Sequence, residues 1–312
     1  MPCFSVIIPA HNAARTLGEA LSSVRRQTYK DWEVVIVDDG STDDTLAVAA
    51  AYVGIDDRIR VVRVANGGPA RARNRAALTE ATGTFLAFLD ADDIWAEDKL
   101  ETSAAALVMR PTLDGVFGQV SFFQVSPADA RTVSRVSLGV LKPADLLGEN
   151  PVCTLSNLVI RRSCFQAVGG FNETLRHAED LECLIRLAAA GGRIAAIQRV
   201  LVHYRTSPAG LSSDLEAMHA GWRKVAEAAQ AAGVRIDDAD QRSAEAVHLR
   251  YLARRALRLR NPGRVSLGFA LRGIRLSPAA FFVPLRRGVS TLLAALAAPL
   301  LPPVVLHRLA GH

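Results

Sequence analysis

Residues 85–93 read FLAFLDADD, five apolar residues followed directly by three carboxylates within four positions. The apolar run predicts a strand covered on both faces, because a strand with one solvated face alternates apolar and polar residues. Carboxylates at a strand end suit Mg²⁺ or Mn²⁺, ions that usually bind one or two protein carboxylates together with substrate phosphates. The alternative is a solvated acidic turn that caps the following helix.

Similar apolar runs flank this stretch and alternate with helical patterns. Strands are expected at 4–8, 32–37, 59–64 and 85–89, and helices at 14–28, 42–54, 69–82 and 96–110. This alternation predicts an α/β fold with a mostly parallel sheet, whose ligand site lies beyond the carboxyl ends of its strands. Polar clusters follow those ends at 9–12, 38–40, 66–68 and 90–93, so we expect them to line one rim.

Beyond residue 112 the pattern is less regular. Strands are expected at 116–125, 155–160 and near 194–204, a helix begins around Ala178, and the chain after residue 212 is expected to be helical.

Two of the polar clusters suggest nucleotide contacts. Asp38-Asp39-Gly40 could bind a base or ribose, as acids do at the corresponding edge of dinucleotide folds, although turn chemistry alone also favours Asp-Gly-Ser there. Asn66 opens a Gly-Gly-Pro turn that is followed by Arg71 and Arg73, which offers a helix N-terminus and cations for phosphate. The G-x-x-x-x-G-K-[ST] and G-x-G-x-x-G motifs are missing, which weakens kinase, ATPase and dehydrogenase interpretations.

The Glu179-Asp180 pair opens a helix whose leucines are spaced for burial. Negative charge in a first helical turn is stabilised by the helix dipole, so a purely structural cap is one interpretation. The other is a general base, because a hydroxyl that attacks the anomeric carbon of a sugar must lose its proton to a positioned group.

Six stretches taken together are more specific than any one of them. They are 4–12 (FSVIIPAHN), 37–43 (VDDGSTD), 72–74 (ARN), 88–93 (FLDADD), 169–173 (GGFNE), and Glu179-Asp180 with Arg186-Leu187. In order and spacing, across about residues 3–213, they resemble the family 2 glycosyltransferases of the GT-A fold. The resemblance implies a GT-A domain over 1–213, with a donor half at about 1–112 and an acceptor half at about 113–213. A basic, helical extension then spans 214–312.

The resemblance also implies roles for the donor site. Asp39 would hold the nucleobase, usually uracil, with Pro9 and Asn12 beside it, while Asn66 and Arg73 would support the nucleotide. In the Asp90-Ala91-Asp92 turn, Asp90 would contact the ribose or donor sugar, and Asp92 would bind the Mn²⁺ or Mg²⁺ that bridges the diphosphate.

On the acceptor side, Asp180 would be the general base, so that a single displacement inverts the anomeric carbon. The sequence departs from the family pattern at Ser207-Pro208, where a histidine that helps the metal or diphosphate is often found. His203 is close in sequence, but strand alternation would point it to the opposite face, and we expect it to be a satisfied core or surface residue. Glu182-Cys183 also replaces a usual aromatic residue.

The charge of the chain is unevenly distributed. Residues 242–312 hold 12 arginines and one acid, Glu245, a net charge of +11, so the first 241 residues carry a net −5. Basic helices with apolar faces suit an anionic membrane surface, and Leu252, Leu259, Phe281 and Phe282 are the expected apolar contacts. Val289–Leu306 is a run of 18 uncharged residues, in which we expect an interfacial or core-packed helix that ends near Pro299. The alternatives are a subdomain packed on the catalytic core and an oligomer contact.

Composition narrows the remaining possibilities. Few aromatic residues argue against a base-stacking nucleic-acid surface, and four scattered cysteines without a C-x-x-C pair argue against a zinc site or a disulfide framework. With no signal-peptide pattern, we expect a cytoplasmic protein, peripheral at the inner face of the plasma membrane, with a glycan or lipid-linked acceptor. A non-catalytic sugar-nucleotide-binding or scaffold protein remains the alternative. A nucleotidyltransferase would need a glycine-rich loop after the first strand, which residues 9–14 do not provide.

Overall fold

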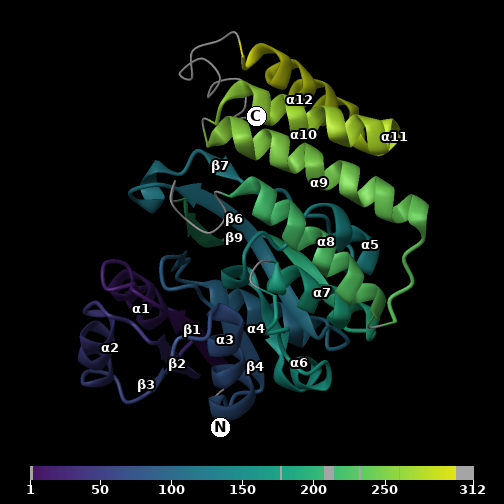
Figure 1. The fold of residues 1–312 in the computed structure, drawn as a ribbon. Helices are drawn as coiled ribbons and strands as arrows, with labels where there is room; N and C mark the ends of the chain where they lie inside the picture. The colour runs from purple at the N-terminus through teal and green to yellow at the C-terminus, as the bar shows by residue number, and fades with distance from the viewer. Residues whose placement is uncertain (1–2, 176–177, 207–213, 232, 260, 300–312) are drawn as a thin grey trace. The chain divides into compact units, whose positions relative to one another are not determined.

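The computed structural model describes residues 3–175, 178–206, 214–231, 233–259 and 261–299, and the chain forms two compact units (Figure 1). The first unit is Met1–Leu141 with Pro151–Thr206, and the second is Lys142–Asn150 with Ser207–His312. This division differs from the expected one in two respects: the second unit begins at residue 207 instead of 214, and it includes a segment from the middle of the chain. Lys142–Asn150 belongs to the second unit, because its helix α5 (Pro143–Gly148) packs against α9 (Asp238–Arg258).

The described strands of the first unit form one sheet. They are β1 (Phe4–Ala10), β2 (Trp32–Asp39), β3 (Ile59–Val64), β4 (Phe85–Phe88), β5 (Ile94–Trp95), β6 (Gly115–Phe123), β7 (Thr132–Val133), β8 (Val159–Arg161) and β9 (Ile194–Arg205). Their order is β3-β2-β1-β4-β8-β6-β9-β5, with β7 beside β6. Strands β1 to β4 pair in parallel, and β8 runs antiparallel to both β4 and β6. The first four carboxyl ends therefore meet at one edge, as the sequence predicted.

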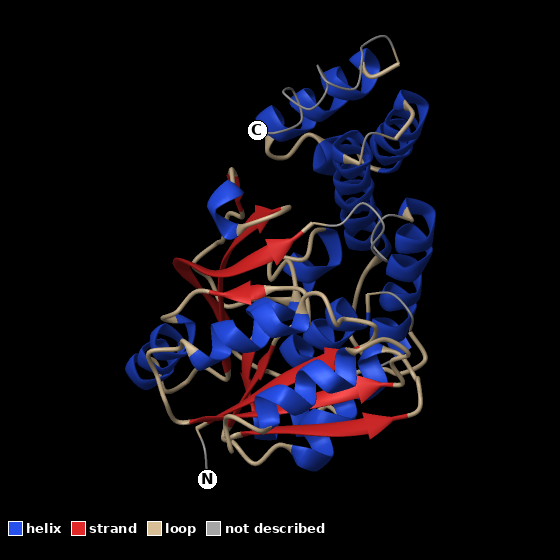
Figure 2. Cartoon of the chain, turned by 90° about the vertical axis from the view of Figure 1, so that its left-hand side faces the viewer, coloured by secondary structure: helices blue, strands red, loops and turns tan. Residues whose placement is uncertain are grey.

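Helices flank the strands of this unit on both sides (Figure 2). They are α1 (Leu17–Arg25), α2 (Thr45–Val53), α3 (Pro69–Asn74), the π-helix η1 (Arg75–Glu80), α4 (Lys99–Met109), the 3₁₀-helices η2 (Pro127–Asp129) and η3 (Leu155–Asn157), α6 (Arg162–Ala167) and α7 (Glu179–Ala189). Alternate residues of β1, including Val6 and Ile8, pack in one core with Leu21 and Val24 of α1. The strand predicted at 155–160 is wrong in its first half. Thr154 caps η3 by accepting a hydrogen bond from the backbone N–H of Ser156, and the strand begins only at Val159.

The described part of the second unit is helical, as expected. Its elements are α5, α8 (Leu215–Ala231), α9, α10 (Gly263–Leu276), α11 (Pro278–Phe281) and α12 (Leu285–Ala297). Leu249 and Leu252 of α9 share a buried apolar cluster with Phe269 and Phe281. The sequence prediction that Leu252 and Phe281 face lipid is therefore wrong, because neighbouring helices cover both of them.

Prolines divide the basic segment 264–287 among three helices. Pro278 starts α11 directly after the end of α10, and Pro284 precedes α12. Helix α12 ends at Ala297, close to the predicted end near Pro299, and residues 300–306 lie outside the described part of the chain. No helix formed by the described residues is both long and apolar enough to cross a membrane.

Candidate functional site

The ends of the first three strands are tied together by polar side chains. His11, after β1, has its Nδ1 2.8 Å from the backbone carbonyl oxygen of Asp39 at the end of β2. Asn66, after β3, donates to the same carbonyl from its side-chain amide at 3.1 Å, and that amide nitrogen lies 3.1 Å from His11 Nδ1. Three of the four predicted polar clusters therefore form one rim.

The Asp39 carboxylate closes the turn that follows β3. Its two oxygens accept hydrogen bonds from the backbone N–H groups of Gly67 and Gly68, both at 2.8 Å. Gly68 has φ +88°, in the left-handed region that glycine adopts without strain. The buried acid is thus held by donors that also fix the start of α3.

Pro9 and Asn12 shape the rim beside Asp39. Pro9 lies beyond the last residue of β1 that pairs with β4, so its missing N–H leaves no gap in that ladder. Asn12 has φ +49°, and its side-chain oxygen accepts from the backbone N–H of Thr42 at 2.9 Å. The Asn12 side chain therefore orders the loop after β2.

The acidic turn after β4 is anchored by its last member. Asp93 is fully buried and accepts a hydrogen bond from the Ser156 hydroxyl at 2.5 Å and one from the backbone N–H of Arg205 at 3.0 Å. Burial, together with the charges of Asp90 and Asp92, raises the pKa of the Asp93 carboxyl well above its usual range. This carboxyl therefore links the turn to η3 and to the end of β9.

Asp92, unlike Asp93, is exposed. Partial burial of its carboxyl and the charge of Asp90 raise the pKa of Asp92 to about 6, although the residue as a whole is exposed. The Arg205 side chain donates to the backbone carbonyl of Asp92 at 3.0 Å, so its carboxylate is not occupied by that contact. Ala91, between the two acids, is buried.

Arg73 joins the acidic turn to the start of α7. Its guanidinium forms ion pairs with Asp90 at 2.7 Å and with Glu179 at 2.8 Å, and the residue is only 7% exposed. Burial opposes the charge of Arg73, but Asp90 and Glu179 outweigh it and hold its pKa above the usual value. The structure therefore brings together Arg73, Asp90 and the Glu179-Asp180 pair.

The start of α7 is set by the glycine turn before it. Asn74 accepts from the Phe171 backbone N–H and donates to the Phe171 carbonyl, both at 2.8 Å. Gly170 has φ +76°, and a Cβ there would lie 2.5 Å from Asn74 Oδ1. Arg186 of α7 donates to the Gly170 carbonyl at 2.6 Å, which fastens the helix to this turn.

Asp180 stands in the first turn of α7. Burial and the neighbouring charge of Glu179 raise its pKa to about 6. Such a carboxyl is ionised at neutral pH yet more basic than an ordinary aspartate, which suits it to accept a proton.

Sequence reasoning did not identify several residues that support the site. Thr154, Ser156 and Arg205 hold the acidic turn, and none belongs to a motif that indicates this role. His203 lies 2.6 Å from the Ser121 hydroxyl through its Nδ1, which agrees with the expectation that it is satisfied. Burial lowers its pKa.

The acidic turn fits a cation that the substrate helps to bind. Among the described residues, no three His, Cys, Asp or Glu side chains are placed to hold a metal by themselves. Asp90 is paired with Arg73, and burial together with the nearby charge of Asp90 raises the pKa of Asp92. A divalent cation would relieve this repulsion, so the donor set fits one ion held mainly by Asp92 and completed by diphosphate and water.

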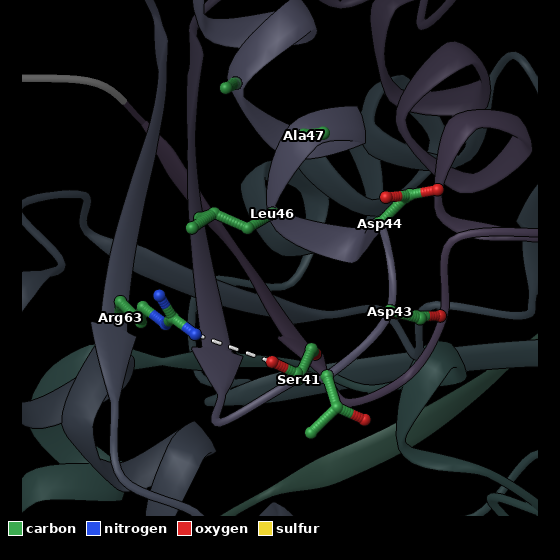
Figure 3. A pocket seen from close by; sticks show the side chains of 8 residues that line it. Ser41, Asp43, Asp44, Leu46, Ala47 and Arg63 are labelled. Carbon is green, nitrogen blue, oxygen red and sulfur yellow. Dashed lines mark hydrogen bonds between the residues drawn. The ribbon is translucent and has the colours of Figure 1, made fainter.

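A separate pocket opens beside the start of α2 (Figure 3). Its described lining includes Ser41, Asp43, Asp44 and Arg63, and Arg63 donates weakly to the Ser41 carbonyl at 3.5 Å. None of the predicted site residues lines this pocket. It borders the loop after β2 and does not contain the acidic turn.

A family model and the most similar named proteins agree on one kind of protein. The sequence model of Glycosyl transferase family 2 matches residues 5–169. A Mycobacterium bovis protein named PGL/p-HBAD biosynthesis glycosyltransferase is 32% identical over 216 residues, 69% of this chain and 80% of that protein. The Bacillus subtilis protein named putative teichuronic acid biosynthesis glycosyltransferase TuaG is 44% identical over 110 residues, 35% of this chain and 43% of its own length. The match therefore spans less than half of TuaG.

Solved structures show the fold. S. aureus TarS 1-349 in complex with UDP-GlcNAc aligns with a TM-score of 0.60 at 19% identity, covering 94% of this chain and 90% of that one. The mannosyltransferase PcManGT from Pyrobaculum calidifontis, in complex with GDP-Man and Mn²⁺, aligns with a TM-score of 0.54 at 23% identity, covering 98% and 79%. The expected GT-A-like α/β fold is confirmed.

Proposed function

Since the chain belongs to Glycosyl transferase family 2, we propose that it moves a sugar from a UDP-sugar to a hydroxyl of a glycan or lipid-linked acceptor, with inversion at the anomeric carbon. One observation carries the proposal. Arg73 pairs with both Asp90 and Glu179, so the donor turn and the residue next to the candidate base share one buried cation. Donor and acceptor chemistry can then occur side by side.

The rim of β1, β2 and β3 is the proposed nucleotide site. Asp39 would receive the nucleobase, with Pro9, Asn12 and Asn66 around it. The bound UDP and UDP-GlcNAc named for the TarS structures support a uridine nucleotide. Because the Asp39 carboxylate already accepts two backbone N–H bonds, it is held in a fixed orientation, from which it can accept a further bond from a base N–H.

The acidic turn is the proposed diphosphate and metal site. Asp92 would hold Mn²⁺ or Mg²⁺, while Asp90, oriented by Arg73, would contact the ribose or donor sugar. When bound, the cation would stabilise the charge that develops on the leaving diphosphate. The Mn²⁺ named for PcManGT supports the choice of metal. Arg73 adds fixed positive charge from the protein itself.

Asp180 is the proposed general base. An acceptor hydroxyl hydrogen-bonded to its carboxylate would lose its proton as the oxygen attacks the anomeric carbon, and the nucleoside diphosphate would leave from the opposite face. The pKa of about 6 supports this role, because the carboxylate is both ionised and relatively basic at neutral pH. Glu179 is less suited, since Arg73 already neutralises it.

The relatives' names suggest the class of acceptor. They refer to teichuronic acid and to PGL/p-HBAD biosynthesis, which supports a cell-envelope glycan or lipid-linked acceptor. We accordingly propose that the enzyme works in the cytoplasm at the inner face of the plasma membrane. Self-association through the second unit is compatible with this location.

A panel of nucleotide sugars tests the function. Full-length protein should hydrolyse one UDP-sugar slowly without acceptor, and Mn²⁺ or Mg²⁺ should stimulate this hydrolysis while a chelator stops it. A protein that binds a UDP-sugar but neither hydrolyses nor transfers it, with any metal, would favour the non-catalytic alternative. Turnover of GDP-sugars alone would contradict the uridine assignment but not the transferase assignment.

A further inference from the structure

Helix α12 turns its large apolar residues outward. Leu285, Val289, Leu293 and Leu296 are 69%, 39%, 62% and 49% exposed. With 100° between successive residues of an α-helix, these four positions fall on one stripe along the helix. A helix in a water-soluble bundle normally faces such a stripe toward its core.

The opposite side of α12 explains this orientation. It carries small residues, and Gly288, Thr291 and Ala295 are buried. A Cβ at Gly288 would lie 2.6 Å from the Phe281 carbonyl oxygen, so only glycine permits this close approach. Because the small face is the packed one, these four apolar residues are left outside, whereas Leu292 packs partly against the neighbouring cluster.

The charged residues of the helices around the stripe are all basic. Residues 263–297, which span α10 to α12, contain five arginines and no acid. Two of these arginines form ion pairs within the unit, Arg272 with Glu216 at 2.9 Å and Arg287 with Glu149 at 2.7 Å. The side chains of Arg264, Arg275 and Arg286 form no ion pair or hydrogen bond with any other residue that the structure describes.

Two of these three arginines, Arg264 and Arg286, stand near the two ends of the stripe. Arg286 directly follows Leu285 in the first turn of α12. At the other end, Gly263 of α10 approaches Ala298, just beyond the last residue of α12, and Arg264 is its neighbour. The stripe with Arg264 and Arg286 is called the α12 face below.

We propose that the α12 face docks on the surface of an anionic lipid bilayer. Its large apolar side chains would enter the boundary between headgroups and acyl chains, while the flanking guanidinium groups bind lipid phosphates. A second copy of the chain is a poor occupant, because a two-fold contact would place arginines against arginines with no acid from α10 to α12 to balance them. The proposal replaces Leu252 and Phe281 as the lipid contacts and is independent of the catalytic assignment.

Co-sedimentation of the full-length protein with vesicles tests this surface. Phosphatidylcholine vesicles that contain phosphatidylglycerol are compared with pure phosphatidylcholine vesicles, at low and high salt. Wild-type protein should sediment with the anionic vesicles. Val289→Ser/Leu293→Ser should reduce partitioning by at least about tenfold, because two large apolar contacts are lost. Arg264→Gln/Arg286→Gln should weaken binding mainly at low salt, where charge attraction is least screened.

A matched control comes from the first unit. Val108 and Met109 of α4 are 79% and 81% exposed, so Val108→Ser/Met109→Ser removes more exposed apolar surface than the α12 variant does and should still leave partitioning unchanged. Circular dichroism checks that the variants keep their helices. If Val289→Ser/Leu293→Ser loses helicity, the single variant Leu285→Ser carries the same test.

Three results would overturn the proposal. The first is wild-type protein that stays in the supernatant with anionic vesicles at low salt, and the second is an α12 variant that sediments as well as the wild type. The third is a dimer, detected by light scattering, that becomes a monomer in Val289→Ser/Leu293→Ser while vesicle binding is unchanged. The α12 face would then bind a second copy of the chain. Donor hydrolysis without vesicles should be equal in all variants. Vesicle binding by a protein that hydrolyses no donor would reject the proposed function and leave this inference standing.

Discussion

Arg73 in α3 forms an ion pair of 2.8 Å with Glu179, the first residue of α7, across 106 positions of the chain. The same guanidinium binds Asp90. It therefore connects the donor half of the sheet to the helix that carries Asp180. Removing one partner of a buried ion pair typically costs about 3–5 kcal/mol, because the other charges stay buried without compensation.

Arg73→Met should therefore lower both stability and activity. The expected loss in the free energy of unfolding is about 3 kcal/mol, measured by urea titration. Arg73→Lys should fold better but lose much of the activity, because one ammonium group cannot replace a planar guanidinium that binds two carboxylates. Arg71→Lys, an exposed arginine in the same helix, is the control and should resemble wild type. Glu179→Gln in the Arg73→Met background should restore part of the lost stability. No restoration would show that the two residues are not coupled.

Asp92→Ala should abolish donor turnover and metal-dependent donor binding while the fold remains intact. The residue is exposed at the rim and contributes little to the core, so the thermal unfolding midpoint of the variant should stay close to that of the wild type. Isothermal titration of a UDP-sugar with and without Mn²⁺ makes the measurement. Asp57→Ala, an exposed acid remote from the turn in sequence, is the control. Equal stimulation of Asp92→Ala and wild type by Mn²⁺ would reject Asp92 as the metal ligand.

Asp180→Asn should bind donor as wild type does but transfer sugar about 10²–10⁴ times more slowly, the usual contribution of a general base. Steady-state kinetics should therefore show an unchanged KM for donor and a reduced kcat. Glu179→Gln provides the comparison, because it loses the contact with Arg73 but keeps the Asp180 carboxylate. Wild-type transfer by Asp180→Asn, together with an inactive Glu179→Gln, would assign the base to Glu179.

The second unit should lose stability in mild acid. His248 stacks on Trp222, with 5.4 Å between ring centroids, and burial lowers its pKa to about 3, with a smaller contribution from His219. The unfolded chain takes up a proton near the ordinary pKa of 6.5, whereas the folded unit does not, so stability falls as pH decreases from about 6.5 toward 3. For His248 alone the loss between pH 7 and pH 5 is about 2 kcal/mol.

Hydrogen exchange of α9 amides under urea, at pH 7 and pH 5, measures this effect. His219 stacks on His248, and burial, with Arg272 and Arg223, lowers its pKa although Glu245 and Glu216 act in the opposite direction. It therefore adds a dependence of the same sign. His248→Phe keeps an aromatic ring in the stack and should remove most of the slope. An unchanged slope in this variant would assign the acid sensitivity to other groups.

The sequence by itself determined the sheet edge and the polar residues that lie along it. Parallel strands align their carboxyl ends, so the apolar runs before residues 9–12, 38–40, 66–68 and 90–93 were enough to gather those polar clusters. The spacing of apolar residues along the helices was an equally local signal, and so was Pro299, near which α12 ends. These properties depend on residues close together in the chain, which is why patterns reveal them.

Only the tertiary structure decided which of these residues act on one another. Arg73 contacts Asp90 and Glu179, and Asp93 contacts Ser156, because segments that are distant in the chain come together in the fold. The spacing of residues in the sequence does not reveal such contacts. Packing also reversed the expected roles of the apolar residues in the second unit. Leu252 has neighbouring helices to cover it, whereas α12 packs through small residues and leaves Leu293 outside. Hydrophobicity requires an apolar side chain to avoid water, but the contacts formed by the folded chain decide which side chains do so.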